Sequence, residues 1–178
     1  MGSEMCIRDR RIIVFFILIT AFLGYFLINE IELQISQYKG LSSALNFPKA
    51  KVISKDFSPL GTLHVVKSPA IHSAAGLSLN YQGELPPQLG LFTDADSMSA
   101  ITQFDGNISK LKYLDYTTAA LPYHLLKKPN VLILGTGGGT GILRGIYHKS
   151  SSIDAVELNP KVIELVNNRY GDFSSHIY

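Results

Sequence analysis

The glycine-rich stretch at residues 131–145 constrains the fold of this 178-residue chain more than any other. The apolar run VLIL leads into five glycines within the seven positions from Gly135 to Gly141. Short unbroken apolar runs are typical of parallel strands that are covered on both faces, and glycines allow a tight turn into a helix. A second expected strand, SIDAVEL at 152–158, follows that helix. The order strand, helix, strand predicts a right-handed βαβ unit.

Each glycine of the turn has an expected purpose. Gly135 ends the strand, and Gly141 lets the following helix pack near it. Gly137 and Gly139 lack a Cβ, so a ligand can approach the backbone closely. The helix N-terminus presents free N–H groups, which favour a carboxylate or a phosphate.

Glu157 stands at the end of the second strand, twenty residues after Gly137. An acid at this place can bind both hydroxyls of a ribose, so we expect an adenosine-type ligand at the carboxyl ends of the strands. The dinucleotide pattern G-x-G-x-x-G fails at Thr140, and no lysine follows Gly141 as a phosphate loop requires. The pattern G-x-G-G-G is closer to the nucleoside site of enzymes that use S-adenosylmethionine. A turn that binds nothing is disfavoured, because each glycine costs about 0.5–1 kcal/mol relative to alanine.

Residues 51–112 read as a small β-domain. The runs KVISKDF, GTLHVV, LSLNYQG, QLGLFTD and SAITQFDG alternate and are separated by Gly, Pro and Asp, which predicts roughly four to six antiparallel strands. Asp94 and Asp96 are either a turn between strands or a paired-carboxylate site, and the turn is favoured. After residue 113 we expect a helix over 115–126, perturbed by Pro122, and a later helix that begins with Asn159 as its cap.

The N-terminal region has three parts. Residues 1–10 resemble translated sequencing-adaptor DNA, so we expect them to be a non-native leader. Residues 11–29 contain a long run without charge, which predicts a transmembrane helix; a signal peptide and a buried helix are the alternatives. Residues 30–50 read as a connector with one short helix. Arg8, Arg10 and Arg11 would place the N-terminus inside, but two of these lie in the leader, so the charge count does not define the native orientation.

Composition excludes several classes of function. The net charge of +2 argues against a general nucleic-acid binder. Cys6 is the sole cysteine of the sequence, so no internal disulfide and no thiolate metal cluster can form. The histidines show no metal-ligand spacing, and we expect no metal site.

The stretches VLILGTGGGTGILRG and IDAVELNPKVIELV resemble the spermidine synthase family, the polyamine aminopropyltransferases. The N-terminal apolar run makes the chain more similar to bacterial membrane-attached spermidine synthase-like proteins. The resemblance implies a mixed α/β fold. In it, the β-domain of residues 51–112 precedes a Rossmann-like methyltransferase-type domain, of which residues 113–178 are the truncated start.

The resemblance also implies a set of site residues. The S-adenosyl ligand would be lined by the glycine loop and the end of the second strand, namely Gly135, Gly137, Gly138, Gly139, Thr140, Glu157 and Leu158. Tyr116 would lie near the amine substrate, although Thr117 and Thr118 stand where the family has histidine and glutamate. Thr140 stands near the place of the family's aspartate for the amino-acid-like tail. The catalytic aspartate is expected beyond the C-terminus, so residues 1–178 alone are expected to be inactive.

The resulting expectation is aminopropyl transfer from decarboxylated S-adenosylmethionine to a polyamine or related amine. The alternatives are an S-adenosylmethionine-dependent methyltransferase and a non-catalytic, membrane-anchored module that binds an S-adenosyl compound. The expected location is the bacterial inner membrane, with the catalytic domain in the cytoplasm. A homodimer is compatible with the family.

Overall fold

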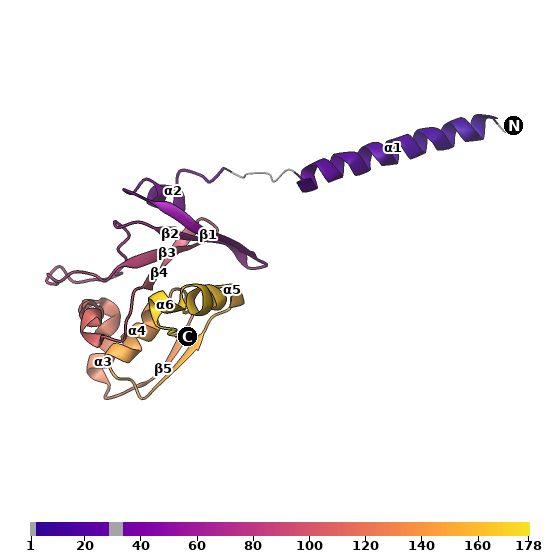
Figure 1. Cartoon of the computed structure of the whole chain (residues 1–178). Coiled ribbons are helices and arrows are strands. Elements are labelled where there is room, and N and C mark those ends of the chain that lie inside the picture. The colour runs from indigo at the N-terminus through magenta and orange to yellow at the C-terminus, as the bar shows by residue number, and fades with distance from the viewer. Residues whose placement is uncertain (1–2, 29–33) are drawn as a thin grey trace. The chain divides into compact units, whose positions relative to one another are not determined.

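The computed structural model describes residues 3–28 and 34–178 (Figure 1). The chain divides into two units, Met1–Gln34 and Ile35–Tyr178. Residues 1–2 of the predicted leader, residue 29 of the predicted membrane helix and residues 30–33 of the predicted connector lie outside the described residues.

In the first unit the described residues 3–28 form one helix, α1 (Ser3–Ile28). Its large apolar side chains between Ile12 and Ile28 are exposed wherever the structure describes them. Over residues 3–28 and 34–178, no helix reaches the combined length and hydropathy needed to cross a bilayer. The membrane span predicted for residues 11–29 is therefore not supported.

The second unit begins with a short helix, α2 (Gly40–Leu45), and a four-stranded antiparallel sheet. The strands are β1 (Lys51–Ser58), β2 (Gly61–Lys67), β3 (Gln88–Thr93) and β4 (Asp96–Thr102), in that spatial order. Asp94 and Ala95 turn β3 into β4 with positive φ angles of 50° and 61°. Asp94 also accepts a hydrogen bond from the Thr62 N–H at 2.9 Å, so this acid is a turn residue, as expected.

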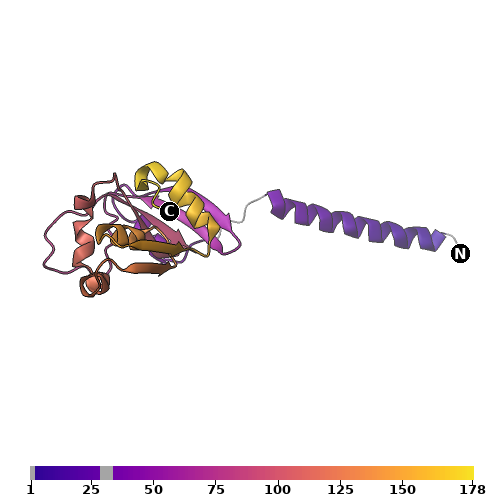
Figure 2. The same cartoon turned by 90° about the horizontal axis from the view of Figure 1, so that it is seen from below.

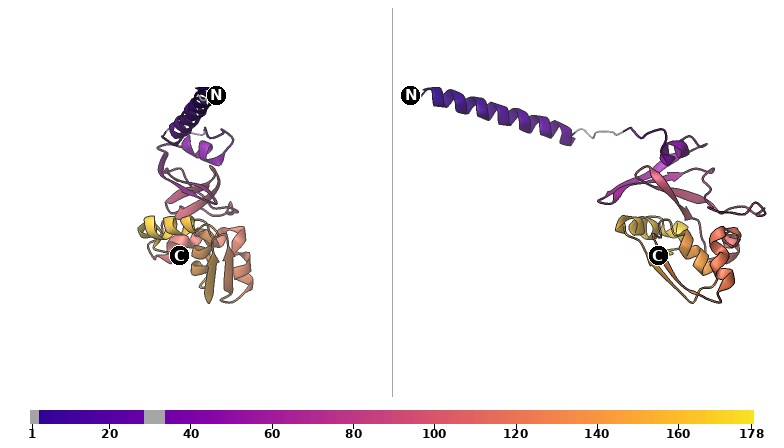
Figure 3. Two further views of the ribbon diagram at one scale, coloured as in Figure 1. Left: turned by 90° about the vertical axis from the view of Figure 1, so that its right-hand side faces the viewer. Right: turned by 180° about the vertical axis from the view of Figure 1, so that it is seen from behind.

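Successive side chains of the strands point to opposite sides of the sheet, and both faces are apolar. Helices cover each face (Figures 1 and 3). On one face, α2 packs through buried Leu41 against Val66 and Phe92. The opposite face packs against the helices near the C-terminus. Its core contains Leu63, Val65, Leu89, Leu91, Ile101, Val162, Leu165 and Val166. Burying side chains of this size stabilises the fold by about 1.5–3 kcal/mol each.

The strand predicted from LSLNYQG is wrong. Residues 77–83 form a loop. Its β-pairing with another segment is limited to one isolated bridge between Leu77 and Thr117. Leu77 and Tyr81 pack instead against a cluster that includes buried Tyr113 and Leu114. The side chain of Ser78 accepts a hydrogen bond from the Asn80 N–H at 3.2 Å, a local contact that competes with a β-ladder.

The helix predicted over 115–126 is divided into three short pieces. The 3-10 helices η1 (Ile108–Tyr116) and η2 (Thr118–Ala120) precede α3 (Leu121–Leu125). Pro122 lies in the first turn of α3, where its missing N–H has no intrahelical partner to lose. The proline therefore begins the helix rather than perturbing its middle.

The parallel pairing predicted for the glycine region is confirmed. Strand β5 (Asn130–Leu134) pairs in parallel with β6 (Ser152–Val156), and α4 (Thr140–Tyr147) connects them (Figure 2). A Cβ on Gly141 would lie 3.2 Å from the side chain of Ile133, so this glycine allows α4 to approach the strand, as expected.

The expectation that β5 is covered on both faces is wrong for the described residues. Leu132 and Leu134 are 64% and 74% exposed, because alternate side chains of the strand point away from α4. Only Val131 and Ile133 are partly buried.

The chain then enters α5 (Pro160–Glu164), the π-helix η3 (Leu165–Arg169) and α6 (Gly171–Ser174). The side chain of Asn159 accepts a hydrogen bond from the Lys161 N–H at 3.0 Å, which confirms Asn159 as the helix cap. Helix α6 was not predicted. The architecture is mixed α/β, with one antiparallel sheet and one parallel strand pair.

Candidate functional site

The loop between β5 and α4 takes backbone conformations that suit glycine. Gly135, Gly137 and Gly139 have φ angles of 74°, 53° and 91°, in the left-handed region that side chains disfavour. The last of these is also the N-cap of α4. The sequence therefore folds into a sharp turn whose residues cannot be exchanged without strain.

The bare positions of the loop face different surroundings. At Gly135 a Cβ would meet no atom within 4 Å. At Gly137 it would lie 2.5 Å from the hydroxyl of Ser99, and at Gly138 it would overlap the carbonyl oxygen of Ala100. At Gly139 it would overlap the side chain of Ile177. A ligand could therefore approach the backbone closely at Gly135. The next three glycines instead let the loop pack against other parts of the chain.

Glu157, directly after β6, is hydrogen-bonded both to the glycine loop and to the cap of α5. Its Oε2 accepts a hydrogen bond from the Gly137 N–H at 2.9 Å, and its Oε1 accepts one from the Asn159 N–H at 3.0 Å. A carboxylate has about four acceptor positions, so two remain for a ligand such as a diol. The side chain is partly buried.

A cavity of about 350 Å³ opens beside this carboxylate, and we call it the Glu157 cavity. Its size lies near the lower end of ordinary ligand sites, which run from about 300 to 1,000 Å³. It is formed by the glycine loop, the start of α5 and the β3–β4 hairpin. Its lining residues are Leu60, Leu91, Thr93, Ser97, Ser99, Gly135, Gly137, Glu157, Leu158, Asn159 and Val162.

Four of the predicted site residues thus share one cavity: Gly135, Gly137, Glu157 and Leu158. Gly138, Gly139 and Thr140 do not line it. Tyr116, the predicted amine-substrate residue, is also not among its lining; its ring lies 5.1 Å from that of Tyr81.

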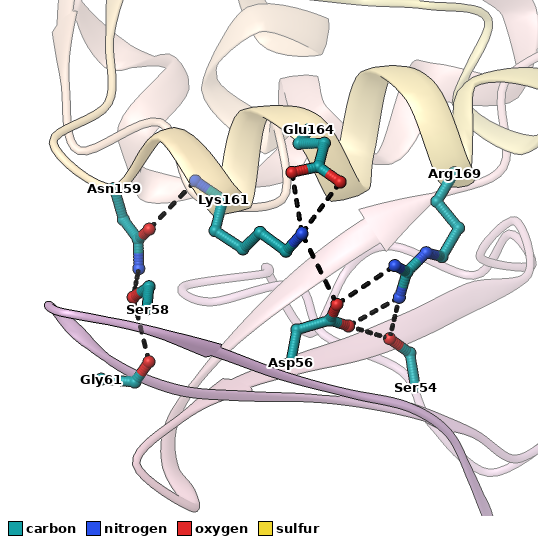
Figure 4. A network of polar contacts seen from close by, with 8 residues as sticks. All are labelled: Ser54, Asp56, Ser58, Gly61, Asn159, Lys161, Glu164 and Arg169. Atoms are coloured by element: carbon teal, nitrogen blue, oxygen red, sulfur yellow. Dashed lines mark hydrogen bonds and ion pairs between the residues drawn. The ribbon is translucent and has the colours of Figure 1, made fainter.

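A polar network holds α5 at the edge of the cavity (Figure 4). The Asn159 Nδ2 donates to Ser58 Oγ at 2.9 Å, and that hydroxyl donates to the Gly61 carbonyl at 3.0 Å. The helix cap is therefore fixed to the β1–β2 turn. Because the Asn159 N–H donates to Glu157, the network also orients the carboxylate.

The second half of the network is an ion cluster. Arg169 donates to both carboxylate oxygens of Asp56, at 2.6 and 3.1 Å, and Lys161 Nζ lies 3.8 Å from the same carboxylate (Figure 4). Burial raises the pKa of Asp56, but the hydrogen bonds from Ser54 and Arg169 outweigh it, and the pKa is lowered. Asp56 therefore stays ionised and ties β1 to η3.

Tyr178 contributes to the site in a way that the sequence did not indicate. Its hydroxyl donates a hydrogen bond to the carbonyl oxygen of Gly137. Burial raises the pKa of Tyr178, and the nearby charge of Glu157 raises it further, so the phenol remains a donor at neutral pH. The contact spans 41 residues of sequence, and no local pattern signals it.

Two histidines treated as scattered in the sequence converge on one acid. Asp115 Oδ1 lies 3.0 Å from His124 Nε2 and 3.6 Å from His148 Nε2. Within the part of the chain that the structure describes, no group of three or more His, Cys, Asp or Glu side chains could hold a metal ion.

Comparison of the chain with models of protein families, with curated proteins and with solved structures found no match in any of the three.

Proposed function

We propose that the Glu157 cavity binds an S-adenosyl nucleoside. The observation that carries the proposal is the contact of Glu157 with the Gly137 N–H beside the open position at Gly135. The carboxylate would accept hydrogen bonds from both ribose hydroxyls with its two remaining acceptor positions. Leu158, 80% exposed, and Leu60 offer apolar surface for the purine ring.

The reaction we propose for the whole protein is aminopropyl transfer from decarboxylated S-adenosylmethionine. A neutral amine nitrogen forms a bond to the propyl carbon next to the sulfonium. The C–S bond breaks with its electron pair going to sulfur, methylthioadenosine leaves, and the amine proton passes to a base. Residues of this chain would contribute by holding the nucleoside so that nucleophile and carbon are in line.

Methyl transfer from intact S-adenosylmethionine is the second candidate, and one observation favours it. Glu157 is the one carboxylate among the lining residues of the cavity, and backbone N–H groups already engage both of its oxygens. Within that lining, no acid is left for the ammonium groups of a polyamine acceptor.

Calorimetry on the full chain tests the proposal. We expect methylthioadenosine and at least one S-adenosyl compound to bind. Glu157→Ala is expected to weaken both by roughly tenfold or more, because hydrogen bonds to a charged group contribute about 1.5–3 kcal/mol. Glu164→Ala is the matched control, since that glutamate pairs with Lys161 away from the cavity. Binding that survives Glu157→Ala unchanged would remove the proposal.

The proposal includes attachment to the bacterial inner membrane through α1, with the remaining unit in the cytoplasm. The exposed apolar side chains of that helix support it, since a surface of this kind is stabilised by a lipid environment. Sedimentation with membranes tests this part. The full chain is expected in the pellet, and the double variant Leu18→Arg, Phe22→Arg in the supernatant.

A further inference from the structure

A second cavity, of about 240 Å³, lies next to the Glu157 cavity and shares Ser99 with it. We call it the Arg144 cavity. Ser73, Tyr113, Thr117 and Thr140 also line it, so five residues that carry hydroxyl groups and one arginine surround a single small space. Among these residues only Thr140 has a role expected from the sequence, and the proposed nucleoside site assigns none to Arg144.

Arg144 has no partner in this cavity. Its Nε is buried and makes no hydrogen bond, and no carboxylate of the described residues forms an ion pair with it. Burial lowers the pKa of Arg144, while Tyr123 and Tyr113 act weakly in the opposite direction. A guanidinium nevertheless remains charged at every physiological pH. The protein therefore holds an uncompensated positive charge at a half-buried place.

The surroundings do not cancel this charge. Burial raises the pKa of both Tyr113 and Tyr123, so the two phenols stay neutral. Thr140 is the first residue of α4, and the positive end of that helix lies at the same cavity. Partial burial without a partner makes this charge unfavourable, and a ligand of opposite charge offsets that cost.

We propose that the Arg144 cavity binds an aliphatic carboxylate, which receives hydrogen bonds from the guanidinium and from the hydroxyl of Thr140, whose hydrogen turns to the ligand from its long 3.5 Å contact with the Ala100 carbonyl. The planar guanidinium can donate two parallel hydrogen bonds to a carboxylate. A protonated amine is repelled from the same place. The site therefore selects an anionic group, and a polyamine does not enter it.

The carboxylate has two sources that the geometry allows. It is either the methionine tail of intact S-adenosylmethionine, which reaches from the adjoining cavity, or the acid group of a separate acceptor substrate. The first source rests on the proposed function, whereas the second does not.

Two binding measurements on the full chain distinguish the sources. In the first, the affinity of S-adenosylmethionine is compared with that of its decarboxylated form. In the second, succinate is titrated while the side-chain Nε–H resonance of Arg144 is followed by NMR, with succinamide as the uncharged probe. Binding through the tail predicts a preference for the carboxylated nucleoside of roughly tenfold to a hundredfold. Binding of a separate acceptor predicts a shift of the Arg144 resonance with succinate and none with succinamide.

Variants decide whether Arg144 is responsible. Arg144→Gln is expected to abolish the preference for a carboxylate in whichever measurement shows it, and Arg144→Lys to keep part of it. Lys149→Gln, at an exposed position two residues after the end of α4, is the matched control and is expected to change neither measurement. If Arg144→Gln does not fold, the wild-type resonance and Arg144→Lys still provide the answer.

The inference is overturned if wild-type protein prefers a carboxylate in neither measurement, or if the preference persists in Arg144→Gln. Its failure is separable from failure of the proposed function. Equal binding of both nucleosides without a response to succinate removes the Arg144 site and keeps the nucleoside site. A response to succinate through Arg144, with no nucleoside bound, does the reverse.

Discussion

The Gly137 N–H donates a hydrogen bond to Glu157 Oε2 at 2.9 Å, and this contact joins the glycine loop after β5 to the residue that follows β6. The other carboxylate oxygen receives the N–H of Asn159, the cap of α5. One side chain thus holds the loop that leads into α4 and the cap of α5 at the same edge of the parallel strands. The proposed nucleoside site and the local stability of the fold depend on the same carboxylate.

Glu157→Ala is therefore expected to destabilise the protein even without ligand. The substitution leaves two backbone N–H groups without their acceptor, which costs about 1–3 kcal/mol where these groups are shielded from water. Glu157→Gln keeps one carbonyl oxygen and is expected to lose less. Denaturant unfolding of the unit formed by residues 35–178, observed in the full chain, measures the difference. Equal stability of the wild type and Glu157→Ala would contradict the geometry.

The glycines of the loop are expected to differ in how they tolerate alanine. Gly138→Ala places a methyl group against the backbone carbonyl of Ala100, which cannot rotate away, and overpacking of this kind costs about 1–3 kcal/mol. It also strains the contact of the Gly138 N–H with Ser99 Oγ at 2.7 Å. Gly135→Ala meets open space and is expected to cost only its backbone strain, about 1–2 kcal/mol.

The two variants separate packing from ligand access. Gly135→Ala fills the open position beside the cavity, so it is expected to weaken nucleoside binding more than it weakens folding. Gly138→Ala is expected to weaken folding more than it weakens nucleoside binding. Calorimetry and thermal unfolding of both variants provide the comparison. The reverse order of effects would show that Gly138, rather than Gly135, approaches the ligand.

The local sequence pattern was sufficient to predict the parallel pair of strands and the helix that connects them. The apolar run VLIL, the glycine turn and the Asn159 cap are short-range signals. Each led to an element that the structure contains. The same kind of reasoning failed for residues 77–83. There the spacing of Leu77, Tyr81 and Leu85 suits packing on a helical cluster, and turn contacts replaced a ladder.

Other parts of the site depend on contacts between distant segments. Ser99 meets Gly138 across 39 residues, and Tyr178 meets Gly137 across 41. In the sequence, Arg144 is an ordinary polar residue on an amphipathic helix. Only the folded chain places residues of β4 and η1 around it. No window of a few residues contains such information, because it arises only when tertiary packing brings the segments together.

The ion cluster of Asp56 and Arg169 predicts loss of stability in acid. The folded-state pKa of Asp56 is depressed below its ordinary value of 3.8, so its contribution is present above that value and is lost as pH falls through the folded-state pKa. Arg169→Met removes two charged hydrogen bonds and is expected to cost about 1–3 kcal/mol at neutral pH. Unfolding midpoints of wild type and Arg169→Met between pH 7 and pH 3 test this. The two curves are expected to converge at the acid end, and parallel curves would contradict it.

A buried histidine, His64, and a partly buried one, His148, predict a separate pH effect at milder acidity. Burial lowers the pKa of His64 below 6.5, assisted by the charge of Lys55, and burial likewise lowers the pKa of His148. The unfolded chain therefore binds these protons at higher pH than the folded chain does. Stability is complete above about pH 6.5 and falls as pH decreases below it.

His64→Gln and His148→Gln are each expected to reduce the slope of stability against pH between about pH 6.5 and 5, because glutamine takes up no proton on unfolding. Replacement of exposed His72 by glutamine is the matched control. Equilibrium urea unfolding at several pH values gives the slopes. Because His64 lies on the sheet face near α2 and His148 follows the end of α4, the two reductions are expected to add in the double variant. A double variant that keeps the wild-type slope would mean that both imidazoles accept protons in the folded protein as easily as in water.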